Sequence, residues 1–181
     1  MPAEKKPRML LHCCCAPCTT YVLEKLLPDY NISLLFYNPN IEPHIEYEKR
    51  KNELKRLIQE ESFYSNVKLL ECEYDNTVFS NAVLSLRNEP EGAARCSVCF
   101  EMRLNETAKR AKMGEYDIFT STLSVSPHKN AKLLNELGSK LAKKHGVDYL
   151  NTDFKKQNGY LRSIELSNKY NLYRQEYCGC Q

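Results

Sequence analysis

Nine cysteines stand out in this sequence, and eight of them fall into three short clusters. The clusters are HCCCAPC at residues 12–18, CSVC at 96–99 and CGC at 178–180. Thiolates bind metals, and a structural zinc site built from cysteines uses four of them. The three clusters hold more thiols than one zinc ion takes, so the pattern predicts a larger cofactor or two metal sites assembled from distant segments.

The first cluster has the spacing of a strand-to-helix junction. Pro17 is typical of the first turn of a helix, which makes Cys18 a neighbour of Cys14 and Cys15 on one helical face. Backbone N–H groups at a helix start favour thiolates and negatively charged clusters. The second cluster is a C-x-x-C that opens another predicted helix, and in the third Gly179 permits a tight turn.

A count of thiols suggests how such a site is divided. Cys72 lies on a predicted strand and is interpreted as a core residue. A [4Fe-4S] cluster takes up to four cysteines. If four of the seven candidate thiols bind the cluster, three remain for one more metal ion, and the spacing does not say which thiol binds which metal. The seven candidates are Cys14, Cys15, Cys18, Cys96, Cys99, Cys178 and Cys180.

Apolar runs separated by longer helical patterns predict the elements that position these thiols. Strands are expected at 9–12, 32–37, 67–72, 117–122 and 147–150. Their alternation with helices predicts an α/β fold, a single-domain parallel sheet with helices on both faces, spanning residues 1–181. In such sheets ligands bind at the carboxyl ends of the strands. That edge should carry the first cysteine cluster together with residues 38–40, Asp75, Ser121, Thr122 and Asp153.

Two aspartates are the candidates for a non-cysteine ligand or proton donor. Asp75 is preferred and Asp153 comes next, although a surface aspartate that ends a strand explains each equally well. His12, at the end of the first strand, is interpreted as a hydrogen-bonded packing residue rather than a ligand.

Composition excludes little. The net charge of +3 neither requires nor rules out a polyanionic partner. No stretch has the apolar length of a membrane span, and MPAEKKPR is not followed by the apolar region of a secretion signal, so we expect a cytoplasmic protein without a membrane partner. In that compartment thiols stay reduced, which argues against a disulfide framework.

Five motifs in order resemble the QueH-type epoxyqueuosine reductases of tRNA queuosine biosynthesis. They are LLHCCCAPC, FYNPNI, EPEGAARCSVCFEMRL, FTSTLSVSPHKN and LYRQEYCGC, and they extend from about residue 9 to the C-terminus. The resemblance implies a two-electron reduction that removes the epoxide oxygen of epoxyqueuosine at the tRNA wobble position, using a [4Fe-4S] cluster and a neighbouring iron. Members of the family often have a small residue at the position of Cys13, which is therefore left out of the seven.

The fold implied by the resemblance is similar to the adenine-nucleotide alpha-hydrolase, or pyrophosphatase-loop, fold. The Ser-Gly-Gly-x-Asp-Ser motif that its ATP-using members carry after the first strand is absent, and HCCCAPC stands in its place. ATP chemistry is therefore not expected.

A tRNA substrate suggests further contacts. Loop bases would stack on aromatic rings and phosphates would meet basic side chains, for which the candidates are Tyr37, Tyr173, Tyr177, Arg95, Lys129 and Arg174. The basic run KRKNELKR at 49–56 is more typical of a solvated helix face, and Ser121, Thr122 and Ser126 would bind a ribose or phosphate or cap a helix. An external low-potential electron donor is required, and we expect a monomer.

Three other classes of protein share part of this pattern. A zinc-stabilised RNA-binding module would use one set of four cysteines. A dithiol oxidoreductase would cycle disulfides between cysteine pairs. An iron-sulfur tRNA thiolating enzyme would need ATP and the phosphate motif that this sequence lacks.

Overall fold

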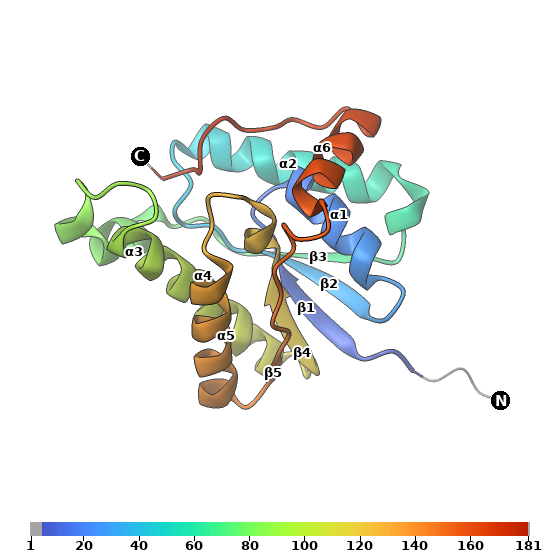
Figure 1. The fold of residues 1–181 in the computed structure, drawn as a ribbon, viewed down its shortest axis with the longest axis horizontal. Helices are drawn as coiled ribbons and strands as arrows, with labels where there is room; N and C mark the ends of the chain where they lie inside the picture. Colours follow the sequence, from blue (N-terminus) through green and yellow to red (C-terminus); the bar gives the residue numbers. More distant parts are fainter. Residues whose placement is uncertain (1–4, 181) are drawn as a thin grey trace.

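The protein is built on one five-stranded parallel sheet. The computed structural model describes residues 5–180, and within them the strand order is β3-β2-β1-β4-β5 (Figure 1). Each pair of neighbouring strands is parallel, which confirms the predicted sheet. The strands are β1 Arg8–His12, β2 Asn31–Phe36, β3 Lys68–Glu71, β4 Ile118–Ser121 and β5 Asp148–Tyr149.

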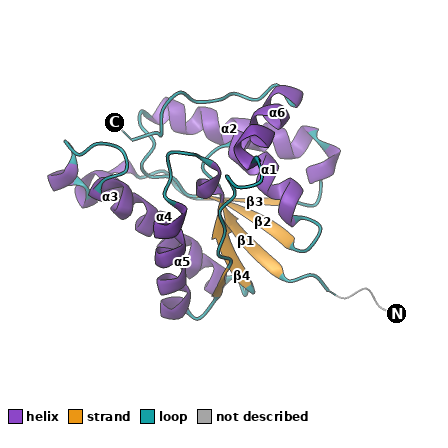
Figure 2. Ribbon diagram, viewed as in Figure 1, coloured by secondary structure: helices purple, strands orange, loops and turns teal. Residues whose placement is uncertain are grey.

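Helices cover both faces of the sheet, as predicted (Figure 2). One layer holds α1 (Ala16–Leu26), α2 (His44–Glu60) and α6 (Gly159–Lys169), and α1 packs against the other two. The opposite layer holds α4 (Ala94–Met113) and α5 (Ala131–His145), with the short α3 (Asn76–Ala82) against α4. Single 3-10 turns occur at Ser62–Tyr64, Leu84–Leu86 and Thr122–Val125.

The two layers form separate apolar cores because side chains alternate along each strand. In β1, Met9 and Leu11 pack in the core beneath α1 and α2, whereas Leu10 packs with α4 and α5. In β2, Leu34 belongs to the first core and Leu35 to the second. Because helices cover both faces of the sheet, ligands can bind only at its edges.

Local sequence explains where the main helices begin and end. α1 begins directly after the extended Cys15, and Pro17 lies in its first turn. The Asn130 side chain accepts a hydrogen bond from the Leu133 N–H and caps α5. Gly146 ends α5 in the left-handed region at φ 67°, a conformation that glycine adopts readily.

The sequence patterns did not predict α3 and α6. α6 follows Gln157 and Asn158, which both have positive φ, and no side chain caps its start. Its first residue, Gly159, packs closely on α1, since a Cβ atom there would lie 2.5 Å from the Tyr21 ring and 1.8 Å from the Phe154 carbonyl oxygen. Beyond α6 the chain runs back along α2 to the C-terminal cysteines (Figure 1).

None of the helices in the described residues is both long and apolar enough to cross a membrane.

Candidate metal-thiolate site

The first group of thiols consists of Cys14, Cys15 and Cys18, and their sulfur atoms all lie within 4.8 Å of one another. The chain leaves β1 at His12, turns through these cysteines and enters α1, so the group lies at the carboxyl end of the central strand. The sulfur atoms of Cys14 and Cys15 are 3.8 Å apart, and Thr122 Oγ1 lies 3.8 Å from the Cys14 sulfur. This is the compact set of soft donors that a metal-thiolate site requires.

Hydrogen bonding concentrates negative charge on one member of this group. Bonds from Cys15 and then Cys18 lower the pKa of Cys14 well below its usual range. The bond to Cys14 raises the pKa of Cys15 to about 12, and it raises that of Cys18 as well. Cys14 is therefore the first of the three thiols to ionise, and the other two ionise less readily beside it.

The second group of thiols comes from two distant segments. Cys96 and Cys99 belong to the first two turns of α4, and Cys178 and Cys180 lie at the end of the chain. Cys99 and Cys180 pack in one small apolar cluster. A hydrogen bond from Cys180, together with the charges of Lys129 and Arg103, lowers the pKa of Cys178 to about 5.

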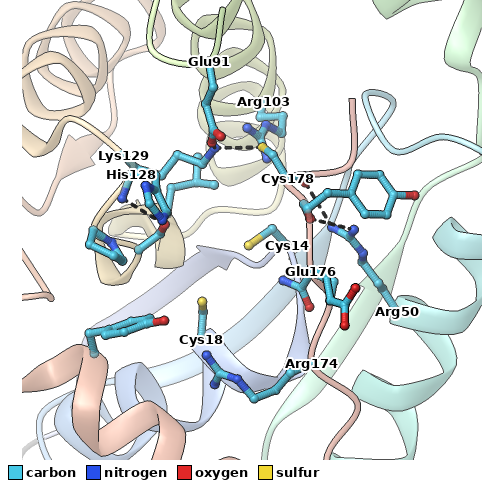
Figure 3. A pocket seen from close by; sticks show the side chains of 16 residues that line it. Cys14, Cys18, Arg50, Glu91, Arg103, His128, Lys129, Arg174, Glu176 and Cys178 are labelled. Atoms are coloured by element: carbon cyan, nitrogen blue, oxygen red, sulfur yellow. Dashed lines mark hydrogen bonds and ion pairs between the residues drawn. The ribbon is translucent and has the colours of Figure 1, made fainter. Parts of the chain in front are cut away.

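One cavity of about 290 Å³ connects the two groups. Cys14 and Cys18 line it from the first group and Cys178 from the second, and Figure 3 shows their sulfur atoms around one space. Arg103, Lys129 and Arg174 contribute positive charge to the wall. The structure thus brings thiols from the beginning and end of the chain into one site.

Arg103 is the main charged group that the sequence analysis missed. It is 2% exposed and its Nη2 atom has no hydrogen-bond partner among the described residues. Although burial disfavours its charge, the thiolates of Cys99, Cys178 and Cys14 raise its pKa. No carboxylate of the described residues forms an ion pair with it, so the thiols supply its counter-charge. Arg103 follows Cys99 by one helical turn, and this spacing could have indicated that its side chain lies on the same helix face as the thiol.

Lys129 is the second buried cation. Its Nζ atom lies 2.7 Å from the sulfur of Cys178 and 2.9 Å from the Glu91 carboxylate. Burial opposes its charge, but Cys178 and Glu91 raise its pKa overall. The sequence analysis proposed Lys129 as a phosphate contact, whereas here its ammonium group is bound to the thiol site.

The two predicted aspartates do not line this cavity. Asp75 is the N-cap of α3, where it accepts a hydrogen bond from the Thr77 N–H at 3.0 Å. Asp153 forms an ion pair with Lys155 at 2.8 Å and lines a different cavity. The prediction placed every strand end in one pocket, but the loops after β3 and β5 turn these carboxylates elsewhere. The carboxylates at the thiol cavity are Glu91 and Glu176.

Polar residues around the strand ends hold the first thiol group in place. His12 is fully buried, with Nδ1 2.9 Å from Ser121 Oγ and Nε2 3.0 Å from the Tyr37 carbonyl oxygen, which confirms it as a hydrogen-bonded packing residue. Burial and then the charge of Arg103 lower its pKa to about 4, so the ring is neutral. Asn38 donates to the Cys13 carbonyl oxygen at 2.9 Å and fixes the backbone beside Cys14.

The remaining two cysteines lie apart from both groups. Cys13 is fully buried in the core beneath α1, and its thiol donates to the Leu35 carbonyl oxygen at 3.4 Å. Cys72 packs against the core on the opposite face of the sheet, as predicted.

Only part of the expected RNA-contact set reaches the cavity. Tyr177, Arg174 and Ser126 line it, and so do His128 and Tyr160, which the sequence analysis did not name. Thr122 contacts Cys14, Ser121 holds His12, and the remaining candidates lie outside the cavity lining: Tyr37, Tyr173 and Arg95.

The fold and site together define a class of α/β protein: a doubly wound parallel sheet with a thiol-lined cavity at its carboxyl edge. The same fold occurs in a solved structure from Methanocaldococcus jannaschii, described as a predicted subunit of tRNA methyltransferase, with a TM-score of 0.55. That match has 16% sequence identity and covers 89% of this chain and 76% of the other, so it supports the fold alone.

Sequence comparison identifies the family. The family model described as epoxyqueuosine reductase QueH matches residues 9–181. A protein of that name from Staphylococcus epidermidis is 46% identical over 180 residues, covering 97% of this chain and 76% of the relative. One from Streptococcus pyogenes is 42% identical over 177 residues, covering 97% and 69%. The chain therefore belongs to the epoxyqueuosine reductase QueH family of oxidoreductases, as its five motifs predicted.

Proposed function

We propose that this chain reduces epoxyqueuosine at the wobble position of tRNA to queuosine, with two electrons and two protons removing the epoxide oxygen as water. The observation that carries the proposal is the cavity where Cys14 and Cys18 meet Cys178 beside the buried cations Arg103 and Lys129. Membership of the QueH family supplies the substrate.

The cofactors proposed are a [4Fe-4S] cluster and an additional iron ion, held by the seven cysteines of the two thiol groups. The donor set fits them, since three sulfurs lie within 4.8 Å of one another and four more thiols come from α4 and the C-terminus. Bound iron would pass electrons from the donor to the substrate and supply a Lewis acid for the developing alkoxide. The division of the seven ligands between the two metals stays open.

The residues of the chain itself prepare the site for negative charge. Arg103 presents a buried guanidinium with an unused N–H donor at the cavity, and Lys129 is held beside Cys178 by Glu91. Preorganised positive charge in a water-poor site stabilises an oxyanion that develops there. Asp75 and Asp153 receive no catalytic role in this proposal, because their carboxylates serve as a helix cap and an ion pair elsewhere.

The nucleotide is proposed to enter the cavity after leaving the anticodon stack. Its volume of about 290 Å³ is near the lower end of the range for small-ligand sites. Arg174 forms no ion pair with a carboxylate of the described residues, and its guanidinium lies 5.9 Å from the centre of the Tyr160 ring. We propose that Tyr160 stacks on the base and Arg174 binds a phosphate.

The proposal includes the setting in which the reaction occurs. The protein acts in the cytoplasm as a monomer, with residues 1–181 as one catalytic domain. Electrons come from an external low-potential donor, which supplies two for each epoxide reduced.

Metal analysis is the first test. After anaerobic purification and cluster reconstitution, we expect about five irons and about four sulfides per chain. The sample should convert epoxyqueuosine tRNA when supplied with a low-potential reductant. Cys18→Ser should lose iron and activity, whereas the matched control Cys72→Ser should keep both. Zinc without sulfide after reconstitution would exclude the redox mechanism and favour a zinc-stabilised RNA-binding protein.

A further inference from the structure

The last cysteines are held by a helix rather than by the sheet. Residues 170–180, here called the C-terminal segment, contain no helix or strand and run along α2 (Figure 1). Four charged residues of α2 at helical spacing contact this segment: Glu46, Arg50, Glu53 and Arg56. Three of them, Arg50, Glu53 and Arg56, lie within the basic run 49–56, so this part of the run faces the protein rather than solvent.

Arg50 makes the contacts nearest to the thiols. Its Nη1 atom donates to the Cys178 carbonyl oxygen at 3.0 Å, and Nη2 donates to the Tyr177 carbonyl oxygen at 3.1 Å. Its Nε atom donates to Glu46 at 2.7 Å, and the residue is only 2% exposed. Figure 3 shows the guanidinium directed at the backbone of Cys178. One planar group thus joins α2 to two consecutive peptide units, which the single ammonium of lysine cannot reproduce.

Other contacts hold the segment on either side of Arg50. The Tyr173 hydroxyl donates to Glu46 at 3.0 Å, and the Tyr173 N–H donates to Glu53 at 2.7 Å. Arg56 donates to the carbonyl oxygens of Tyr170 and Asn171 at 3.3 and 3.1 Å. Five backbone groups of the segment are therefore satisfied by side chains of α2 in place of a β-ladder.

The chain passes closely over Arg50 between the two thiols. Gly179 has φ 123°, and the Glu42 N–H donates to its carbonyl oxygen at 2.8 Å. A Cβ atom on Gly179 would lie 3.0 Å from Ile41 Cγ1 and 3.3 Å from Arg50 Nη1. The two cysteines on either side of Gly179 consequently take their positions from α2 and the loop before it.

We propose that Arg50 is a positioning residue that places the thiol of Cys178 at the cavity and the thiol of Cys180 beside Cys99. What those thiols then hold rests on the proposed function, but their placement by Arg50 does not. Without the fork of hydrogen bonds, the end of the segment leaves α2 while the first thiol group stays in place.

The test measures each cysteine separately in the full-length, reduced, metal-free chain. Arg50→Lys keeps the charge opposite Glu46 and removes the double contact. We expect the alkylation rates of Cys178 and Cys180, read by mass spectrometry, to rise about tenfold, the effect of losing one charge-assisted hydrogen bond. The rates at Cys14 and Cys96 should not change. Arg56→Lys, the same substitution two turns away on α2, is the control and should leave all four rates unchanged.

Iron content gives a second readout. Reconstituted Arg50→Lys should retain less iron than the wild type, and Arg56→Lys should retain as much. If wild-type protein binds no iron, the proposed function fails, while the alkylation rates still decide the role of Arg50.

Two results would overturn the inference. One is an unchanged rate at Cys178 and Cys180 in Arg50→Lys, and the other is an equal rise at Cys14, which would mean general loosening of the fold. If circular dichroism shows that Arg50→Lys does not fold, the Glu46→Gln/Arg50→Gln double variant decides by the same two criteria, because it leaves no buried charge unpaired.

Discussion

The ammonium group of Lys129 lies 2.7 Å from the sulfur of Cys178 and 2.9 Å from the carboxylate of Glu91. A buried cation is thus shared between a protein carboxylate and a thiol at the cavity. A hydrogen bond from Cys180 and then the charge of Lys129 lower the pKa of Cys178. The contact also links the loop after β4 to the end of the chain.

Lys129→Met should therefore weaken the site without unfolding the protein. Groups that hold metal ligands in place typically contribute 10- to 100-fold to metal affinity or activity, and we expect a loss of about that size. Iron content and the rate of tRNA reduction, measured on one sample, check this. Lys132→Met, an exposed change on α5, is the control. Equal iron content and equal rates in the two variants would contradict it.

Arg103→Gln should impair the reaction more than it impairs folding. The buried guanidinium is balanced by thiols and has an unused donor at the cavity, so its loss removes charge stabilisation from the reduced site and the developing oxyanion. We expect kcat to fall about 100-fold with little change in KM, and the midpoint potential of the bound iron to become more negative. The control is Arg110→Gln on the same helix, whose guanidinium pairs with Glu106. A potential equal to that of the wild type would refute the electrostatic role.

Glu53→Gln should destabilise the protein in a pH-dependent way. Arg56, and then the Tyr173 N–H, lower the pKa of Glu53 below its ordinary value of 4.5, and its side chain is only 16% exposed. We expect the free energy of unfolding at pH 7 to fall by about 1–2 kcal/mol.

The direction of the pH dependence follows from the lower pKa of Glu53 in the folded state. Above pH 4.5 the carboxylate is charged whether the chain is folded or not, and its stabilisation is complete. As the pH falls below that value the unfolded chain takes up the proton first, so the advantage of wild type over Glu53→Gln shrinks. Urea unfolding at several pH values measures the difference in unfolding free energy between the wild type and Glu53→Gln. A difference that grows on acidification would contradict the prediction.

Gly138→Ala should destabilise the layer formed by α5. A Cβ atom at Gly138 would lie 2.3 Å from the Tyr149 ring, so the ring or the helix must move. Overpacking of this kind costs about 1–3 kcal/mol, measurable as a lower thermal midpoint. Ser139→Ala, the neighbouring residue on the same helix, should change the midpoint little, since its hydroxyl bonds only to the exposed side chain of Asn151.

Short-range patterns were sufficient for much of the fold. The strands at residues 9–12 and 32–37, the helix after Pro17 and the cap at Gly146 are set by residues close in sequence, and the structure contains all of them. α6 was missed because its place depends on packing against α1 rather than on its own start signals.

In the candidate site, too, local sequence decides some features and tertiary structure decides others. The sequence by itself determined that the chain carries a surplus of clustered thiols at a strand-to-helix turn, because spacing along the chain decides which cysteines are neighbours. Only the tertiary structure decided that Arg103 and Lys129 face those thiols and that Asp75 and Asp153 do not. It also showed that part of a basic run on α2 binds the C-terminal segment. Such contacts join distant residues, 49 positions apart for Lys129 and Cys178 and 128 for Arg50 and Cys178. Which side chains meet there depends on how the loops leave the sheet rather than on any local pattern.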